Sequence, residues 1–418
     1  MDLAAPADLN ASRINDATRD ASRPDDAILS IVAVLMALGV VMVCSASVTV
    51  TTPLELRSLW GAPLRQGLFA VAGLVAAVFM SRVGYGLFAW RREGEGWWAG
   101  GLFLAAALLL LAVLVPGVGS SRLGAQRALV VMTTPMTLSF QPSELAKFAL
   151  VIWLAALLTR PGFDVRSFRT GYVPAIASAG LLIGLTGLED FGTAALMGVL
   201  TAALLFAAGA RWLHLIATAL LGLGAGALLI LVRPYRLERL ATFFTDNPDP
   251  SGAGYQVTQS LIAIGSGGWF GNGLGAGVQK YGYLPQDNND FIFAIVCEEL
   301  GAAGGLAIIA LFLLLLWRGW RMCALAAEPM GRLIAFGVTL LLCLQAAVNI
   351  GVVTNSLPTK GISLPFVSAG GSGVLFLGMA AGLLASVAPP PRRREAAGSE
   401  GRGREAEALL PGFATRAR

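Results

Sequence analysis

The sequence predicts an all-α polytopic membrane protein with ten transmembrane helices, and three observations favour this fold class. Hydrophobic residues make up 56% of the 418 residues and charged residues only 13%, whereas a soluble domain carries about 25% charged residues. The mean hydropathy is +0.71. The apolar residues occur in long runs without the alternation of barrel strands, and backbone that meets lipid in such runs satisfies its hydrogen bonds as a helix.

Ten apolar runs, each about one bilayer crossing in length, form a predicted transmembrane domain at 27–388. The runs lie at residues 27–48, 64–81, 97–116, 143–159, 171–188, 191–208, 212–233, 291–317, 331–353 and 365–388. A polar leader at 1–26 precedes them and a basic tail at 389–418 follows them, and both have the composition of disordered segments. The largest connection, at 234–290, joins the seventh and eighth runs.

The positions of the basic residues predict that both termini are cytoplasmic. Most of the 30 lysines and arginines fall in the leader, the tail and the connections on the side of the termini, which is the bias of cytoplasmic segments. The 234–290 connection therefore faces outward. The remaining basic residues lie near the outer face, where they either reach lipid head groups or bind an anionic ligand such as a lipid-linked diphosphate. These residues are Arg57, Arg65, Arg122, Arg127, Lys147, Arg233, Arg236, Arg239, Lys280 and Lys360.

Three acidic residues mark the start of the eighth run. Asp290 stands where the outward connection becomes an apolar helix, and Glu298 and Glu299 follow inside that helix. A carboxylate at membrane depth is costly and indicates a functional site. Asp290 is therefore either a reacting group or the N-cap of the helix. The two glutamates, predicted to lie roughly 12–14 Å deeper at 1.5 Å per residue, are expected to form a buried polar network that holds helices together.

The sequence QPSELAK at 141–147 opens the fourth run. Ser143 is predicted to cap the helix, and Glu144 suits the positive end of the helix dipole. Glu144 and Lys147 are three residues apart and share one helix face. They form either a structural ion pair or a site in which Lys147 neutralises a phosphate while Glu144 fixes the lysine.

The stretch that leads into the last apolar run does not have the sequence of a regular helix start. The stretch 358–372 contains two prolines and a glycine pair, which predicts a broken or re-entrant start to the tenth helix. Such backbone is tolerated at membrane depth only where protein or a water-filled cavity satisfies it, and Lys360 is expected to point into that cavity. In the tight connection 189–193, Asp190 is predicted to cap the sixth helix.

Several kinds of site are disfavoured. The single histidine, His214, argues against a histidine-based metal centre or catalytic triad. The four cysteines lack the spacing of a zinc site or a disulfide framework. The glycines at 265–277 lack the spacing of a nucleotide-binding loop, and they are expected to let the outward connection turn sharply and lie close to a helix or substrate. The preceding stretch 257–264 is predicted to be a short interfacial helix.

Together these motifs resemble the SEDS family of shape, elongation, division and sporulation proteins, which includes RodA and FtsW. The matching stretches are VMVCSAS near Ser45, GAQR at 124–127, QPSELAK at 141–147, EDFGTA at 189–194, and the stretches 254–275, 284–301 and 358–372. The PTKG sequence at 358–361 and the long charged termini are more similar to the FtsW branch. The chain departs from the family pattern at Leu123, Ala128, Ala369 and the pair Asn288–Asn289.

The resemblance implies a peptidoglycan glycosyltransferase of the bacterial cytoplasmic membrane that polymerises lipid II, an undecaprenyl-diphosphate-linked disaccharide pentapeptide, at the outer face during septal wall synthesis. It implies Asp290 as the catalytic residue. The implied substrate-binding residues are Arg65, Arg127, Glu144, Lys147, Lys360 and Ser372.

The resemblance also implies partners, namely a class B penicillin-binding protein with transpeptidase activity and other divisome or elongasome proteins, and it implies no nucleic acid. A divalent cation, Mg²⁺ or Mn²⁺, is a further candidate cofactor. Two other functions stay open, a lipid II flippase and a non-catalytic scaffold that activates the penicillin-binding protein.

Overall fold

The computed structural model describes one helical domain. The described residues are 24–47, 61–90, 97–115, 119–122, 125–132, 138–232, 253–281 and 289–387, with 237, 243 and 244. The leader and tail that were predicted to be disordered therefore lie outside the described residues, except for the few residues next to the first and last helices. Much of the 234–290 connection also lies outside them.

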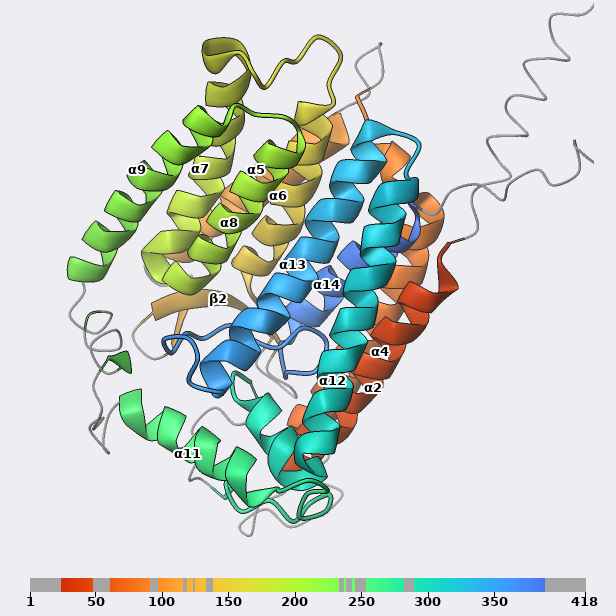
Figure 1. Ribbon diagram of the computed structural model, residues 1–418, viewed down its shortest axis with the longest axis vertical. Helices are drawn as coiled ribbons and strands as arrows, with labels where there is room; N and C mark the ends of the chain where they lie inside the picture. Colours follow the sequence, from red (N-terminus) through yellow and green to blue (C-terminus); the bar gives the residue numbers. More distant parts are fainter. Residues whose placement is uncertain are drawn as a thin grey trace, which may run out of the picture. The chain divides into compact units, whose positions relative to one another are not determined.

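Ten described helices coincide with the ten predicted runs (Figure 1). They are α2 (Asp26–Ser47), α4 (Ala62–Val83), α5 (Trp97–Leu114), α6 (Pro142–Leu158), α7 (Val173–Glu189), α8 (Phe191–Ala207), α9 (Trp212–Leu231), α12 (Ile292–Leu325), α13 (Pro329–Val353) and α14 (Ser372–Ala385). Among the described residues, seven helices are long and apolar enough to cross a membrane, and α8 and α14 are shorter apolar helices. The polytopic helical class is confirmed, and the count of ten crossings stays a prediction.

Three short strands were not predicted. Strands β1 (Gly119–Arg122), β2 (Ala125–Met132) and β3 (Leu138–Phe140) form an antiparallel sheet in the order β1-β2-β3. The sheet lies in the connection between α5 and α6. The β-branched residues Val130 and Val131 near the end of β2 favour a strand, but the segment is too short to give a clear signal in the sequence.

The two described chain ends meet at one end of the bundle, which we call the terminal end. The Asp25 amide donates to Ala385 O at 3.0 Å, and the Asp25 carboxylate pairs with Arg318 Nη2 at 2.8 Å. At the opposite end, which we call the α11 end, α2 finishes at Ser47, and Ser260 of helix α11 (Ala253–Ser266) donates to Val353 O at 2.9 Å. Helix α11 extends the short helix predicted at 257–264.

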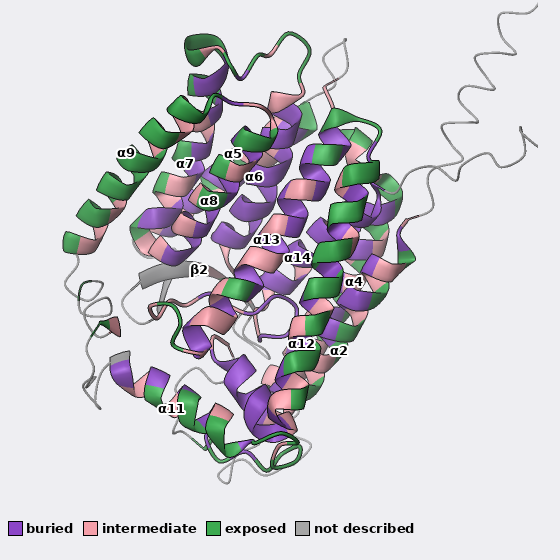
Figure 2. Cartoon of the chain, in the orientation of Figure 1, coloured by how far each residue is buried: buried purple, intermediate pink, exposed green. Residues whose placement is uncertain are grey.

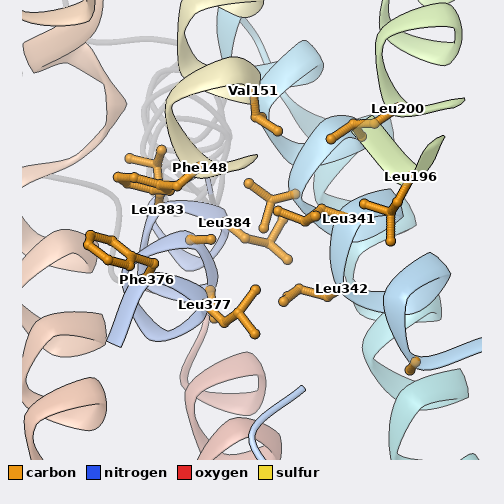
Figure 3. Packing of buried hydrophobic residues seen from close by; sticks show 14 of the residues in the cluster. Phe148, Val151, Leu196, Leu200, Leu341, Leu342, Phe376, Leu377, Leu383 and Leu384 are labelled. Atoms are coloured by element: carbon orange, nitrogen blue, oxygen red, sulfur yellow. The ribbon is translucent and has the colours of Figure 1, made fainter. Parts of the chain in front are cut away.

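Helix α6 is the central helix of the bundle. It packs against α5, α7, α8, α13 and α14, and nearly all of its residues are buried (Figure 2). Phe148 and Val151 of α6 meet leucines of α8, α13 and α14 in the core (Figure 3). Helix α9, by contrast, has no buried residue. The first turn of α6, which carries Glu144 and Lys147, is therefore fixed by packing on several sides.

Helix α12 is broken at Gly301, whose φ is 73°. The glycine-rich loop after α11 lies against this break, because the amides of Asn272 and Gly273 donate to Glu298 O and Glu299 O at 3.0 Å each. The loop thus satisfies carbonyls that the interrupted helix leaves without partners. The expectation that these glycines let the connection lie close to a helix is confirmed.

The predicted depth of Glu298 and Glu299 is wrong. Helices α2 and α12 run antiparallel, with Asp25 beside Arg318 at the terminal end and Ser45 bonded to Glu299 at the α11 end. On the neighbouring α13, Asn349 contacts Asp290 O one turn before the helix ends. The glutamates lie nearer the α11 end than Asp290 does, because the chain reaches that end before the break at Gly301 and only then crosses the bundle.

The break predicts that Gly301→Ala is strongly destabilising. A Cβ at Gly301 would clash with main-chain atoms of Gly271 and Trp269, so the cost combines overpacking of about 1–3 kcal/mol with about 1–3 kcal/mol for placing alanine at φ 73° and ψ −174°, a backbone region that essentially only glycine adopts. Gly268→Ala is the matched control, since Gly268 also has a positive φ of 53° but a Cβ there meets no atom within 4 Å. Thermal unfolding should show a clearly larger loss for Gly301→Ala, and equal losses would contradict this account.

Candidate active site

The segment 358–371 enters α14 without regular structure and is held by side-chain amides. Three of them donate to its main-chain carbonyls. Gln66 Nε2 donates to Ser368 O at 3.1 Å, Gln345 Nε2 to Ser363 O at 3.0 Å, and Asn349 Nδ2 to Ile362 O at 2.7 Å. The broken start predicted for the tenth helix is confirmed, and protein side chains satisfy three of its main-chain carbonyls.

Lys147 lies in a buried ion pair. Its Nζ donates to Glu144 Oε1 at 2.8 Å and to Gln345 Oε1 at 2.7 Å, and Lys147 is only 2% exposed. An ammonium group has three N–H donors, so these contacts leave one donor over. Glu144 Oε2 is buried without a hydrogen-bond partner among the described residues. The predicted ion pair is confirmed, and one N–H of Lys147 and the Oε2 of Glu144 make no hydrogen bond among the described residues.

The cap predicted for this helix is wrong. The N-cap of α6 is Gln141 rather than Ser143, and it makes no side-chain capping bond. Instead, Ser143 Oγ accepts from Gln141 Nε2 at 3.0 Å. The Gln141 amide donates to Ser372 Oγ at 2.9 Å. Ser372, buried at the start of α14, therefore ties the first residues of α14 to those of α6, and its predicted substrate contact stays a prediction.

Asp290 precedes α12 and is tied to α13 through its main chain. Asn349 Nδ2 donates to Asp290 O at 2.8 Å, and Asp290 is half-buried. The N-cap of α12 is Phe291, which makes no side-chain capping bond, so the interpretation of Asp290 as the N-cap is wrong. Since the same Asn349 nitrogen also contacts Ile362, the Asp290 main chain lies beside the segment that carries Lys360.

Lys360 packs against the start of α8. Its Nζ is 5.0 Å from the Phe191 ring centroid, within the range of a cation–π contact. Asp190 caps α8 as predicted, because its carboxylate accepts from Thr193 N at 3.1 Å and from Thr193 Oγ1 at 2.9 Å. Lys360 lies in the connection outside the spanning helices. Burial lowers the pKa of Lys360, while the nearby negative charge of Asp190 partly opposes this shift.

This arrangement predicts a pH effect of Asp190→Asn. Asparagine keeps the cap but removes the charge that raises the pKa of Lys360, so the lysine loses its proton at a lower pH. If protonated Lys360 binds substrate, the alkaline decline of kcat/KM moves to lower pH. Asp164→Asn, a carboxylate substitution in the connection between α6 and α7, should leave the profile in place. An unchanged profile for Asp190→Asn, or a shift to higher pH, would contradict this role for Lys360.

A second buried ion pair lies beside the break in α12. Lys280 Nζ donates to Glu299 Oε1 at 2.9 Å, Gly275 O at 2.7 Å and Ser45 O at 3.2 Å, and both charged side chains are 0% exposed. All three N–H donors of Lys280 are used within the protein. Lys280 thus differs from Lys147 and has no donor left for an anionic ligand. The expected glutamate network is confirmed, since Ser45 Oγ of α2 donates to Glu299 Oε2 of α12 and Glu298 Oε1 accepts from the amides of two loop residues.

The structure describes less of the two arginines, Arg65 and Arg127, that were predicted to bind substrate. Arg65 is half-exposed in the first turn of α4, next to Gln66, which binds the segment before α14. Arg127 lies in β2, and its side chain is outside the described part of the chain. The structure therefore brings Glu144, Lys147, Ser372, the Asp290 main chain and the Lys360 segment to one region, with Arg65 on an adjoining helix.

The residues whose side-chain amides hydrogen-bond the parts of this region to one another were not predicted. Gln66, Gln345 and Asn349 are uncharged, so a search for charges in apolar runs passed over them. Their signal was present in the sequence, because each is a primary amide inside a predicted membrane helix, and Gln345 and Asn349 have the four-residue spacing of one helix face.

Few side chains in the described region could bind a divalent cation. No group of three histidine, cysteine, aspartate or glutamate side chains there could hold a metal ion. Mg²⁺ typically binds through one or two carboxylates together with substrate phosphates and water, and the partnerless Glu144 Oε2 is one oxygen that fits this mode. The divalent cofactor stays a prediction.

Comparison with known proteins identifies the family. A family model described as "Cell cycle protein" and covering FtsW, RodA and SpoVE matches residues 26–392. Stage V sporulation protein E of Bacillus subtilis is 39% identical over 373 residues, covering 88% of this chain and 98% of the relative. The probable peptidoglycan glycosyltransferase FtsW of Geobacter metallireducens is 38% identical over 370 residues, covering 88% and 96%.

Solved structures agree with this assignment. The rod shape determining protein RodA of Thermus thermophilus matches with a TM-score of 0.60 and 27% identity, covering 87% of this chain and 96% of RodA. A chain of a peptidoglycan synthase complex matches with a TM-score of 0.65 and 30% identity, covering 87% and 97%. The chain therefore belongs to the FtsW, RodA and SpoVE family, the SEDS family that its motifs resemble.

Proposed function

We propose that this chain is a peptidoglycan glycosyltransferase that polymerises lipid II into glycan strands at the outer face of the cytoplasmic membrane, in septal wall synthesis. The observation that carries the proposal is one hydrogen-bonded network that ties the Asp290 main chain and the Lys360 segment to the Glu144–Lys147 pair. Several relatives carry the name probable peptidoglycan glycosyltransferase FtsW.

The proposed reaction is a direct displacement at the donor sugar. A hydroxyl of the acceptor sugar attacks the anomeric carbon of the donor, a new carbon–oxygen bond forms, and the bond to the lipid-linked diphosphate breaks. Asp290 accepts the hydroxyl proton as general base, a role worth about 10²–10⁴-fold in rate. A single displacement inverts the configuration at the anomeric carbon.

The basic residues act on the leaving group. Negative charge grows on the diphosphate as it departs, and cations fixed beforehand in a site with little water stabilise such charge strongly. Lys147 offers its remaining N–H donor, and Lys360 offers an ammonium that is held against α8. Arg65 and Arg127 are the further candidates from the family motifs, and Glu144 holds Lys147 in place.

The orientation and the partner belong to the same proposal. The described chain ends meet at one end of the bundle, and the basic residues of the sequence favour the cytoplasm for that end. The α11 end then faces outward. One structural relative belongs to a peptidoglycan synthase complex that coordinates polymerization and crosslinking. A class B penicillin-binding protein is accordingly the proposed partner, and it would crosslink the strands that this chain makes.

Purified protein in detergent tests the activity directly. The chain, with and without a partner transpeptidase, receives fluorescent lipid II, and glycan strands are separated on a gel. Polymerisation needs no second compartment, so strands are expected in micelles. A protein that makes no strands under either condition but moves lipid II across vesicle membranes would be a flippase. A protein that makes none and only stimulates its partner would be a scaffold.

A further inference from the structure

We infer that Gln345 and Asn349 are positioning residues for the proposed transfer. They lie four residues apart on α13, on one helix face, and their exposed fractions are 0% and 1%. Their side-chain hydrogen bonds go to Lys147 and to the main chain around Asp290 and Lys360. The inference rests on the proposed function, because it assigns the pair to that reaction.

Gln345 fixes the direction of the Lys147 ammonium. Its Nε2 donates to Ser363 O at 3.0 Å, so its Oε1 is turned toward Lys147 Nζ, which lies 2.7 Å away. Together with Glu144 Oε1, this oxygen holds two of the three N–H groups of the lysine. The third N–H then has a set direction. Without Gln345, the ammonium can rotate about its single contact with Glu144.

Asn349 fixes Asp290 relative to the Lys360 segment. Its one amide nitrogen donates to Asp290 O at 2.8 Å and to Ile362 O at 2.7 Å. Both hydrogens are used, and Asn349 Oδ1 stays buried without a hydrogen-bond partner among the described residues. A buried acceptor without a partner is unfavourable and offsets part of what the two donated bonds contribute to stability. Its contacts set the spacing between the proposed base and one of the proposed cations.

The test compares apolar and isosteric substitutions in the full-length protein with its partner transpeptidase. The variants are Asn349→Leu, Asn349→Asp, Gln345→Met and Gln345→Glu, and Thr339→Val is the control. Thr339 is a buried hydroxyl on the same helix without a hydrogen-bond partner among the described residues. The measured quantities are kcat and KM for fluorescent lipid II and the thermal unfolding midpoint.

The two positions are expected to give different kinetic signatures. Asn349→Leu should lower kcat by about 100-fold, the scale of a misplacement near 1 Å, with KM little changed. Asn349→Asp should be as inactive, because its carboxylate cannot donate to two carbonyls. Gln345→Met should lower kcat/KM by about tenfold through both constants, because a misdirected ammonium binds the diphosphate less well in the ground state and stabilises its growing charge less well in the transition state. Gln345→Glu should raise KM further, because a second carboxylate beside Lys147 repels the diphosphate. Thr339→Val should match the wild type.

A packing role predicts a different pattern. In that case the activity losses of all four variants would follow their unfolding midpoints, and the activity per folded protein would stay near that of the wild type. That pattern would overturn the inference alone, as would wild-type kinetics in all four variants while the wild type makes glycan strands. A wild type that makes no strands would overturn the proposed function, and this inference with it.

Discussion

Replacing Asp290 by asparagine is expected to reduce lipid II polymerisation by about 10²–10⁴-fold, the range of a lost general base. Asparagine has nearly the same size as aspartate but cannot take up the proton of the attacking hydroxyl. The contact with Asn349 uses the main-chain oxygen of residue 290, so this contact survives the substitution. The initial rate of strand formation from fluorescent lipid II measures the effect, and the thermal unfolding midpoint should stay close to that of the wild type.

A nearby aspartate provides the control. Asp287 lies in the same connection, three residues before Asp290, and Asp287→Asn removes an equal charge while residue 290 stays an aspartate. This variant should polymerise at close to the wild-type rate. If Asp290→Asn also did so, the assignment of the base would be wrong.

Removing the Lys147–Glu144 pair should abolish activity, whereas removing the Lys280–Glu299 pair should not. Both pairs are buried, but only Lys147 keeps an N–H donor for a ligand. A single change such as Lys147→Met leaves a buried carboxylate alone and costs about 3–5 kcal/mol. The double variant Glu144→Gln/Lys147→Met removes both charges and should recover much of this stability while remaining inactive.

The matched double variant is Lys280→Met/Glu299→Gln. It also removes one positive and one negative charge, but from a site in which the lysine uses all three of its N–H donors within the protein. Its polymerisation rate, divided by the folded fraction from size-exclusion chromatography, should stay within a few-fold of the wild type. An inactive Lys280→Met/Glu299→Gln variant beside an active Glu144→Gln/Lys147→Met variant would reverse the assigned roles.

The helices of this protein could be predicted because an apolar run of bilayer length can satisfy its backbone hydrogen bonds in lipid in few ways other than as a helix. Each of the ten predicted runs overlaps a described helix. The small sheet at 119–140 was missed because its strands are too short for a periodic signal. The break at Gly301 was missed because a single glycine inside an apolar run gives no sign of its dihedral angles, which depend on the loop packed against it.

The charged members of the site could also be predicted, because a charge in an apolar run is costly and therefore conspicuous. Glu144 and Lys147 were found in this way, whereas Lys360 was found from the prolines and glycines around it and Asp190 as a helix cap. The amides Gln66, Gln345 and Asn349 were missed, since an uncharged amide adds little to a charge pattern. The different roles of Lys147 and Lys280 depend on how many hydrogen bonds each ammonium group makes within the protein. A sequence does not give these numbers.

In the proposed active site, at the α11 end of the bundle, one carboxylate faces a sugar hydroxyl and two lysines face a diphosphate. The most direct measurement is a cryo-electron microscopy structure of the Asp290→Asn variant with lipid II bound. We predict that the diphosphate lies within hydrogen-bond distance of Lys147 Nζ or Lys360 Nζ, with residue 290 turned toward a sugar hydroxyl. Lipid II bound only at the terminal end of the bundle, or residue 290 turned away from the sugars, would contradict the account.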